Sequence, residues 1–184
     1  MHRLRAIVAG FALVGVLAAV PAAASTETPA AERAKSTVTL QPGLDSAILV
    51  RINAVRVAHG LARLTLNVHL AAAATLHSRE LAKTGLFQHE SPDGGAFWKR
   101  IERYYPPTGF RNWEVGENLL WWSPNTDAAT TVADWLASPP HRKNLLNPVW
   151  RELGVSAIHD RAAPGTYRGL EVTIVTADFG ARTR

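Results

Sequence analysis

The 184-residue sequence contains no cysteine and carries a formal charge of +5. The absence of cysteine excludes disulfides, thiolate catalysis and cysteine-built zinc or iron–sulfur sites. The basic residues are spread along the chain and the aromatic residues lack an RNA-binding pattern, so we expect no nucleic-acid partner. A chain of this length suits one domain with its own core.

The first 24 residues have the composition of a secretory signal. Arg3 and Arg5 give a basic start, an apolar run covers residues 6–20, and three alanines end at Ala24. This order predicts cleavage after Ala24 and therefore a secreted, extracytoplasmic protein. A retained N-terminal anchor is the alternative, but the run is short for a membrane span and no second run follows. We therefore expect a monomer with no transmembrane anchor after cleavage.

The rest of the chain divides into a linker and a domain. Residues 25–41 are rich in Thr, Ala, Pro and Glu and contain few large apolar residues, which predicts a flexible linker. We assign residues 42–184 to a single folded domain. Its patterns predict helices over 44–59, 70–81, 96–103 and 127–137 and a short helix from 138, with strands over 113–122, 153–159 and 170–179.

This order of elements favours an α+β fold. The last two strands are joined by a polar loop that suits an antiparallel hairpin, and the helices come before and between the strands. Helices packed on the faces of a small, mainly antiparallel sheet form a layered domain.

Three residues on separate segments form a candidate metal site, namely His89, Glu117 and His141. Two imidazoles and one carboxylate suit zinc or another divalent ion, with a position left open for water. Spacing alone supports this weakly, because no local motif fixes the geometry. Taken singly, each histidine could equally be a solvated loop residue, and Glu117 could equally be a glutamate at a strand edge, with no role in metal binding.

His141 belongs to the stretch that begins the short helix. Ser138 is expected to be the N-cap and Pro139 the first helical residue, which places His141 in the first turn. The partial positive charge there opposes protonation of the ring. A serine nucleophile at Ser138 activated by His141 is the rival interpretation, but capping already explains the serine. His77 lies on the apolar face of its helix, so we interpret it as a core histidine rather than a ligand.

Six fragments occur in an order that resembles the CAP superfamily, which includes cysteine-rich secretory proteins, antigen 5 and plant pathogenesis-related 1 proteins. The resemblance runs from Leu44 to Gly180 and is closest to cysteine-free bacterial members. The fragments are Ile52-Asn53-x-x-Arg56, Gly60-Leu61-x-x-Leu64-x-Leu66-Asn67-x-x-Leu70-x-x-Ala73-Ala74, Phe87-x-His89-x-Ser91-Pro92-x-Gly94, Gly116-Glu117-Asn118-Leu119, Trp135-x-x-Ser138-x-x-His141-Arg142-x-Asn144-Leu145-Leu146, and Leu153-Gly154-Val155.

The resemblance implies a three-layer α-β-α sandwich with a cleft that carries two histidines and two glutamates. His89, Glu117 and His141 match three of these four positions, and Ser138 stands where the second glutamate would fall. That departure removes a carboxylate and weakens the case for a general base beside a metal. Ser91, Asn118 and Ser138 are further candidates for the cleft, with Asn118 expected mainly to satisfy backbone groups.

Trp121 and Trp122 are adjacent on a predicted strand and should face opposite sides of the sheet. One ring is expected in the core, and the other is free to face a ligand.

Two functions remain open from the sequence. The first is a secreted binding module whose cleft takes an amphiphile, a cell-envelope component or a protein, with a divalent ion as a structural or modulatory element. The second is a metal-assisted hydrolase, a peptidase by preference, with Glu117 and His141 as catalytic candidates. We favour the binding module because the second carboxylate is missing. Zinc is the preferred ion, with magnesium or no metal as alternatives, and the sequence does not identify the ligand.

Overall fold

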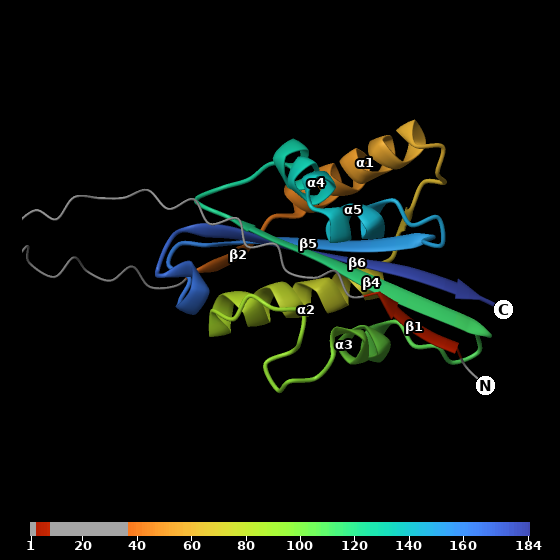
Figure 1. The fold of residues 1–184 in the computed structure, drawn as a ribbon. Helices are drawn as coiled ribbons and strands as arrows, with labels where there is room; N and C mark the ends of the chain where they lie inside the picture. The colour runs from red at the N-terminus through yellow and green to blue at the C-terminus, as the bar shows by residue number, and fades with distance from the viewer. Residues whose placement is uncertain (1–2, 8–36) are drawn as a thin grey trace, which may run out of the picture.

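A computed structural model describes residues 3–7 and 37–184 of the chain (Figure 1). From α1 onward, the described helices and strands follow the order that the sequence patterns predict, with short strands added between them. The elements are β1 (Arg3–Ile7), β2 (Val38–Leu40), α1 (Pro42–Ala58), β3 (Thr65–Leu66), α2 (Val68–Thr84), α3 (Phe97–Tyr104), β4 (Asn112–Trp122), α4 (Ala128–Ala137), α5 (Pro139–Leu145), β5 (Glu152–Asp160), a 3₁₀ turn (Gly165–Tyr167) and β6 (Val172–Thr183).

The strands form one sheet in the order β1-β4-β6-β5-β2, and β3 also pairs with β5. The central pairs β4–β6 and β5–β6 are antiparallel, while β1 and β3 pair in parallel with their neighbours. Helices α1, α4 and α5 cover one face of the sheet, and α2 and α3 cover the other (Figure 1). The predicted three-layer α-β-α sandwich with a mainly antiparallel sheet is confirmed.

Caps explain why α2 extends beyond the apolar period that predicted it. The Asn67 side chain accepts hydrogen bonds from the backbone N–H groups of His69 and Leu70, which begins the helix before its first buried residue. Gly85 ends it in the left-handed conformation at φ 70°. Capping residues carry no hydrophobic signal, so an apolar pattern alone places helix ends too far inward.

Two short strands lie in segments that were not expected to be folded. Val38–Leu40, at the end of the predicted linker, pairs antiparallel with β5 as strand β2. Arg3–Ile7, inside the predicted signal, pairs in parallel with β4 as strand β1. Most of the remainder of the predicted signal and linker lies outside the described residues.

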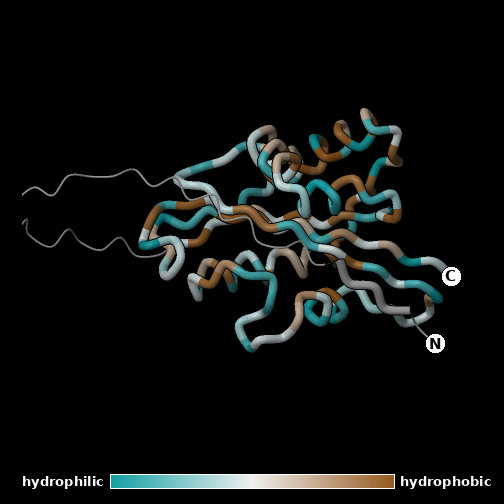
Figure 2. The backbone as a smooth tube through the Cα atoms, in the orientation of Figure 1, coloured by the Kyte–Doolittle hydropathy of each residue, from teal (hydrophilic) through white to brown (hydrophobic). Residues whose placement is uncertain are grey.

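The core is divided between the two faces of the sheet. The larger cluster joins α1, α4 and α5 to β5 and β6 through large side chains such as Ile52, Trp135, Trp150 and Phe179. Two smaller clusters lie on the face covered by α2 and α3. Apolar stretches accordingly run along the central strands in Figure 2. Among the described residues, no helix combines the length and hydrophobicity that a membrane span needs.

Candidate functional site

The site is organised by two successive residues of β4, Glu117 and Asn118. Neighbouring side chains on a strand point to opposite faces, so Glu117 faces the α2–α3 layer and Asn118 faces the α5 layer. Both residues are buried. β4 therefore carries one polar group into each layer at the same height in the sheet.

Glu117 is held by two partners on its own face. His89 donates a hydrogen bond from Nδ1 to Glu117 Oε1 over 2.7 Å, and Arg100 forms an ion pair with Oε2. All three residues are buried, with exposed fractions of 8% or less. Both carboxylate oxygens therefore accept a hydrogen bond. These bonds offset the desolvation free energy of burying the negative charge.

Arg100 also fixes the loop that carries His89. Its Nη1 donates to the backbone carbonyl of His89 at 3.3 Å and to Ser91 Oγ at 3.1 Å. α3 positions this guanidinium because Phe97 and Ile101, which share its buried face, pack into the core. One arginine therefore connects the Ser91 loop, α3 and β4.

These contacts determine the ionisation of Glu117. Burial alone would raise its pKa, but the charge of Arg100, the neighbouring His77 and the hydrogen bond from His89 lower the pKa to about 2. The side chain is therefore a fixed carboxylate at neutral pH. A base with so low a pKa is a poor proton acceptor for general-base catalysis.

On the opposite face, Asn118 fixes α5 to the sheet. Its side-chain NH₂ donates to the His141 carbonyl at 3.1 Å, and its oxygen accepts a bond from Asn144 at 3.0 Å. Trp150 Nε1 donates to the Asn144 carbonyl at 2.9 Å. Gly116 allows this close packing, because a Cβ there would lie 2.6 Å from Asn144 Oδ1. Asn118 satisfies backbone and side-chain groups, as the sequence suggested, and it positions His141.

The imidazole of His141 is half-buried beside α5. Burial, and to a smaller extent the positive charge that His89 can carry, together lower its pKa to about 4. The sequence predicted resistance to protonation from the field of the helix N-terminus, whereas here burial is the main cause. The ring is neutral at physiological pH and can accept or donate one hydrogen bond.

The predicted capping role of Ser138 is only half correct. Ser138 occupies the N-cap position of α5 and also ends α4, but its side chain makes no capping hydrogen bond. With ψ near 115°, the residue joins two helices at a corner. Its hydroxyl oxygen is buried and has no hydrogen-bond partner among the residues that the structure describes, so the reasoning that capping occupies the oxygen was wrong. No contact with His141 is present to activate it.

Three buried polar residues near Glu117 were absent from the sequence-derived site. His77 donates from Nε2 to the Gln88 carbonyl at 2.9 Å and approaches Glu117 Oε1 to 3.9 Å, so this core histidine also borders the site. Asp178 lies directly opposite Glu117 on β6. The sequence did contain a signal for Arg100 and Asp178, because each is a charged residue within an apolar pattern. Arg100 lies on the buried face of α3, and Asp178 lies in the core strand β6.

The residues proposed as metal ligands do not form a ligand set in this arrangement. Within residues 3–7 and 37–184, no three His, Cys, Asp or Glu side chains gather closely enough to hold an ion. Glu117 accepts bonds from His89 and Arg100 through its two oxygens, and the His141 backbone carbonyl accepts a bond from Asn118. The metal site stays a prediction, and we derive no chemical step through an ion.

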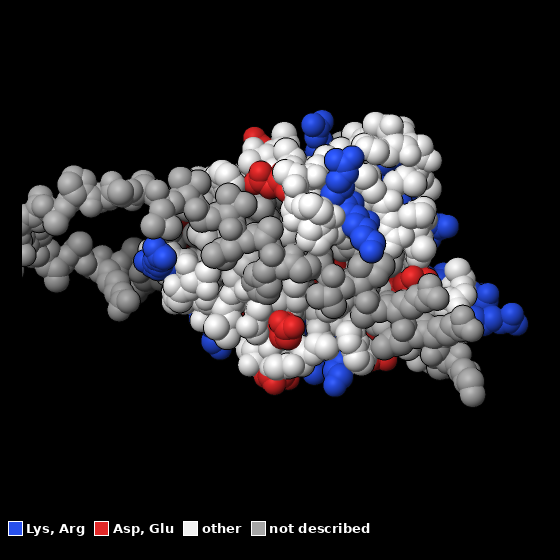
Figure 3. Space-filling model, viewed as in Figure 1, with Lys and Arg blue, Asp and Glu red and all other residues white. Residues whose placement is uncertain are grey.

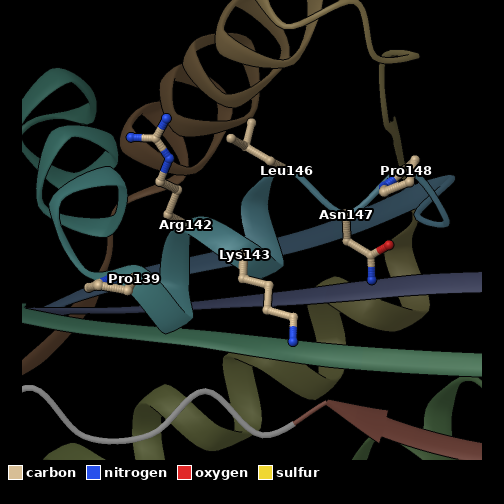
Figure 4. Close-up of a pocket in the computed structure, with 6 residues that line it drawn as sticks. All are labelled: Pro139, Arg142, Lys143, Leu146, Asn147 and Pro148. Carbon is tan, nitrogen blue, oxygen red and sulfur yellow. The ribbon is translucent and has the colours of Figure 1, made fainter.

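Two open grooves lie beside the site. One, of about 370 Å³, is lined by the Ser91 loop and the α3 residues Lys99, Arg100 and Arg103. The other, of about 530 Å³, follows α5 and is lined by Pro139, Arg142, Lys143, Leu146, Asn147 and Pro148 (Figure 4). On the face shown in Figure 3, basic side chains are interspersed with acidic ones, which is unlike the continuous basic stripe of a nucleic-acid interface.

Comparison with known proteins places this geometry in context. A model of the cysteine-rich secretory protein family, CAP, matches residues 49–179. The uncharacterized membrane protein YlbC of Bacillus subtilis is 34% identical over 63% of this chain, and the uncharacterized protein YkwD of the same species is 27% identical over 73%. The aligned regions cover only 32% and 51% of these two relatives.

Solved structures resemble the fold. An extracellular protein containing a SCP domain from Bacillus anthracis aligns with a TM-score of 0.60 and 29% identity, covering 77% of this chain and 41% of that one. An outer surface protein of Borrelia burgdorferi aligns with a TM-score of 0.62 over 80% of this chain and 99% of its own. At 19% identity, the second structure supports the fold alone.

Proposed function

Because the chain belongs to the CAP family of cysteine-rich secretory proteins, we propose that it is a secreted binding module rather than a hydrolase. Its cleft is formed where β4 passes between the Ser91 loop and α5. The ligand is an amphiphile, a cell-envelope component or a protein. Support for an extracytoplasmic location comes from the predicted signal and from the extracellular SCP-domain protein of similar fold.

The observation that carries this proposal is the state of Glu117. The only acidic residue among the three predicted cleft positions is buried, ionised and bonded through both oxygens to His89 and Arg100. A hydrolytic base needs a pKa near the working pH and access to water or substrate. Glu117 has neither, so it serves to hold the cleft in shape.

His141 supplies the group that is suited to meet a ligand. It is half-buried and neutral, and its backbone is anchored through Asn118. A neutral ring on an anchored helix offers hydrogen bonding at little entropic cost on binding. We propose that His141 and the loop bearing Ser91 contact the ligand from opposite layers.

The test uses the isotope-labelled full chain and three probes, namely phosphatidylglycerol vesicles, solubilised peptidoglycan fragments and casein. We expect at least one probe to shift the NMR signals of the His89 and His141 rings without forming a product detectable by mass spectrometry. The His141→Ala variant should lose the shift at His89, and the exposed control His69→Ala should keep it. Turnover of a probe that Glu117→Gln abolishes would establish the hydrolase instead. Absence of any ring shift with all three probes would contradict the binding cleft.

A divalent ion remains a separate proposal. Binding it would require His89 or Arg100 to release Glu117, so we expect weak affinity at best. Metal analysis of protein purified without chelator or affinity tag tests this directly. A stoichiometric ion in that preparation would overturn the expectation.

A further inference from the structure

The groove beside the Ser91 loop has a basic lining. It encloses about 370 Å³ between that loop and α3. The loop supplies Ser91 and residues 93–96, and α3 supplies Lys99, Arg100 and Arg103. Asp93 is the one acidic residue in this lining, against three cations, so the groove favours a negatively charged ligand.

Two of the cations are accessible from solvent. Lys99 and Arg103 are four residues apart on α3, so their side chains leave neighbouring turns of the same face. Both residues are exposed. An oxyanion between them can accept charge-assisted hydrogen bonds from an ammonium and from a planar guanidinium.

The N-terminus of α3 opens into the same groove. The helix begins after Ala96, and an alanine at the N-cap position has no side-chain oxygen to accept bonds from the first turn. The first N–H groups of α3 therefore present partial positive charge that their own N-cap residue does not neutralise. Because Gly95 and Ala96 line the groove, an anion held there lies at the helix N-terminus.

The loop that forms the other wall is held in shape by its own hydrogen bonds. The Gly94 N–H donates to the Ser91 carbonyl, and the Ser91 N–H donates to the Gly95 carbonyl, both at 2.9 Å. Asp93 Oδ1 accepts a bond from the Gly95 N–H at 2.9 Å, so this carboxylate is engaged within the loop. A wall that is already ordered lowers the entropic cost of binding.

Arg100 contributes a buried donor to the same lining. Its residue is 1% exposed, and its Nη atoms bond to Glu117, Ser91 and the His89 carbonyl. Its Nε atom is also buried and has no acceptor within residues 3–7 and 37–184. A buried N–H without an acceptor costs free energy. Since Arg100 lines the groove, a ligand oxygen is suited to supply that acceptor.

We propose that this groove binds a phosphate group, held by Lys99, Arg103 and the first N–H groups of α3. The inference rests on the proposed binding function, because it names a chemical group of the ligand. Free phosphate esters and phospholipid headgroups both carry this group, and the experiment separates the two sources.

The probes are inorganic phosphate, glycerol phosphate and phosphatidylglycerol vesicles, each added to the isotope-labelled full chain at constant ionic strength. We expect inorganic phosphate to shift the backbone amide NMR signals of residues 94–98 saturably, and sodium chloride to leave them unchanged. Lys99→Ala and Arg103→Ala should each weaken phosphate binding by about tenfold, the value of one hydrogen bond to a charged group. The control Lys143→Ala, an exposed cation on α5, should bind phosphate as the unmodified chain does.

A substitution at the N-cap separates anion binding from helix stability. Ala96→Asp places a capping carboxylate at the start of α3, which should maintain or raise the free energy of unfolding. The same carboxylate occupies the first N–H groups and repels phosphate, so binding should fall by about tenfold or more. A purely structural role of the helix N-terminus would not give these opposite effects.

The vesicles distinguish the source of the phosphate group. If it belongs to a lipid, phosphatidylglycerol vesicles should sediment with the full chain and not with the Lys99→Ala/Arg103→Ala double variant. If it belongs to a soluble ester, glycerol phosphate should give the amide shifts and the vesicles should not sediment with the chain. Either result supports the phosphate site.

Three outcomes would overturn the proposal. They are equal shifts with sodium chloride, undiminished phosphate binding by the double variant, and amide shifts confined to residues outside the groove. Ring shifts of His89 and His141 with peptidoglycan or casein, without amide shifts at residues 94–98 with any phosphate probe, would reject the phosphate site and leave the binding module intact. Amide shifts with phosphate, without ring shifts with any probe, would reject the proposed cleft instead.

Discussion

Glu117 on β4 and Asp178 on β6 face each other directly across the antiparallel ladder, and both carboxyl groups are buried. Burial raises the pKa of Asp178 well above its usual value, and the negative charge of Glu117 raises it further against the opposing effect of Arg100. Arg100 and His89 meanwhile keep Glu117 ionised. The pair therefore consists of one carboxylate and one neutral acid, because two like charges cannot share this site.

Asp178→Asn should stabilise the protein at neutral pH. The folded state holds a proton on Asp178 that the unfolded chain releases above a pKa near 3.8, so this residue reduces stability as pH rises. Asparagine keeps the shape without that cost. We expect a gain in the free energy of unfolding at pH 7.5 and a smaller gain at pH 4.5, measured by urea unfolding. A loss of stability at pH 7.5 would show that Asp178 is ionised in the fold.

Arg100→Ala should destabilise the protein strongly, because it leaves Glu117 buried without its cation. Breaking a buried ion pair from one side costs about 3–5 kcal/mol. Arg103→Ala provides the matched control, since Arg103 is exposed on the same helix and should change stability by less than about 0.5 kcal/mol. Urea unfolding of both variants checks the difference. Equal effects would mean that Arg100 stabilises only α3 and not the Glu117 site.

His141 should make stability depend on pH between about 6.5 and 4. In that range the unfolded chain binds a proton at this ring and the folded protein does not, because the folded pKa is lowered to about 4. Stability due to this residue is therefore complete above pH 6.5 and falls as the pH drops toward 4. In His141→Gln, stability should fall less steeply as the pH is lowered through this window, as measured by thermal unfolding at several pH values. An unchanged slope would place the ring in solvent.

The layered fold was predictable because its signals are local. Apolar residues at helical spacing mark one buried face on each of α1 and α2, and the apolar strands β5 and β6 are buried on both faces. The sandwich therefore follows from the order of elements. The short strands β2 and β3 carry two or three exposed residues each and exist only through pairing with β5. No local pattern marks such strands, because their stability comes from a partner distant in the chain.

The candidate site was predictable in its residues but not in its connections. His89 and Glu117 were named together and are in contact. Their bond depends on Arg100, which is supplied by a separate helix. Which of several polar groups pairs with a buried carboxylate depends on distances across layers, and a single sequence does not contain these distances. The same limit applies to Ser138, whose position was correct while its hydrogen bond was not.

Gly154→Ala should destabilise the protein by more than a typical core substitution. A Cβ on Gly154 would collide with the backbone of Leu70 and Ala71 in the first turn of α2, which cannot move aside as a side chain can. The sheet and α2 would have to separate, at a cost of about 2 kcal/mol or more in urea unfolding. Gly43 in α1 provides the control, because a Cβ there meets no atom within 4 Å. Gly43→Ala should be neutral or stabilising, since alanine favours helix.

Ser138→Ala should have little effect on stability, although the serine occupies an N-cap position. An N-cap stabilises a helix through its side-chain hydrogen bond, and Ser138 makes none. Its hydroxyl is buried and no described residue bonds to it, so removing it also removes a desolvation cost. We expect a change within about 0.5 kcal/mol in either direction.

Asp127, which caps α4 by accepting a hydrogen bond from the Thr130 N–H at 2.7 Å, is the matched control. Asp127→Ala should lower the thermal midpoint more than Ser138→Ala in the same buffer. A clear loss of stability in Ser138→Ala would instead show that the hydroxyl has a partner in solution, and loss of ligand binding without loss of stability would identify the ligand as that partner.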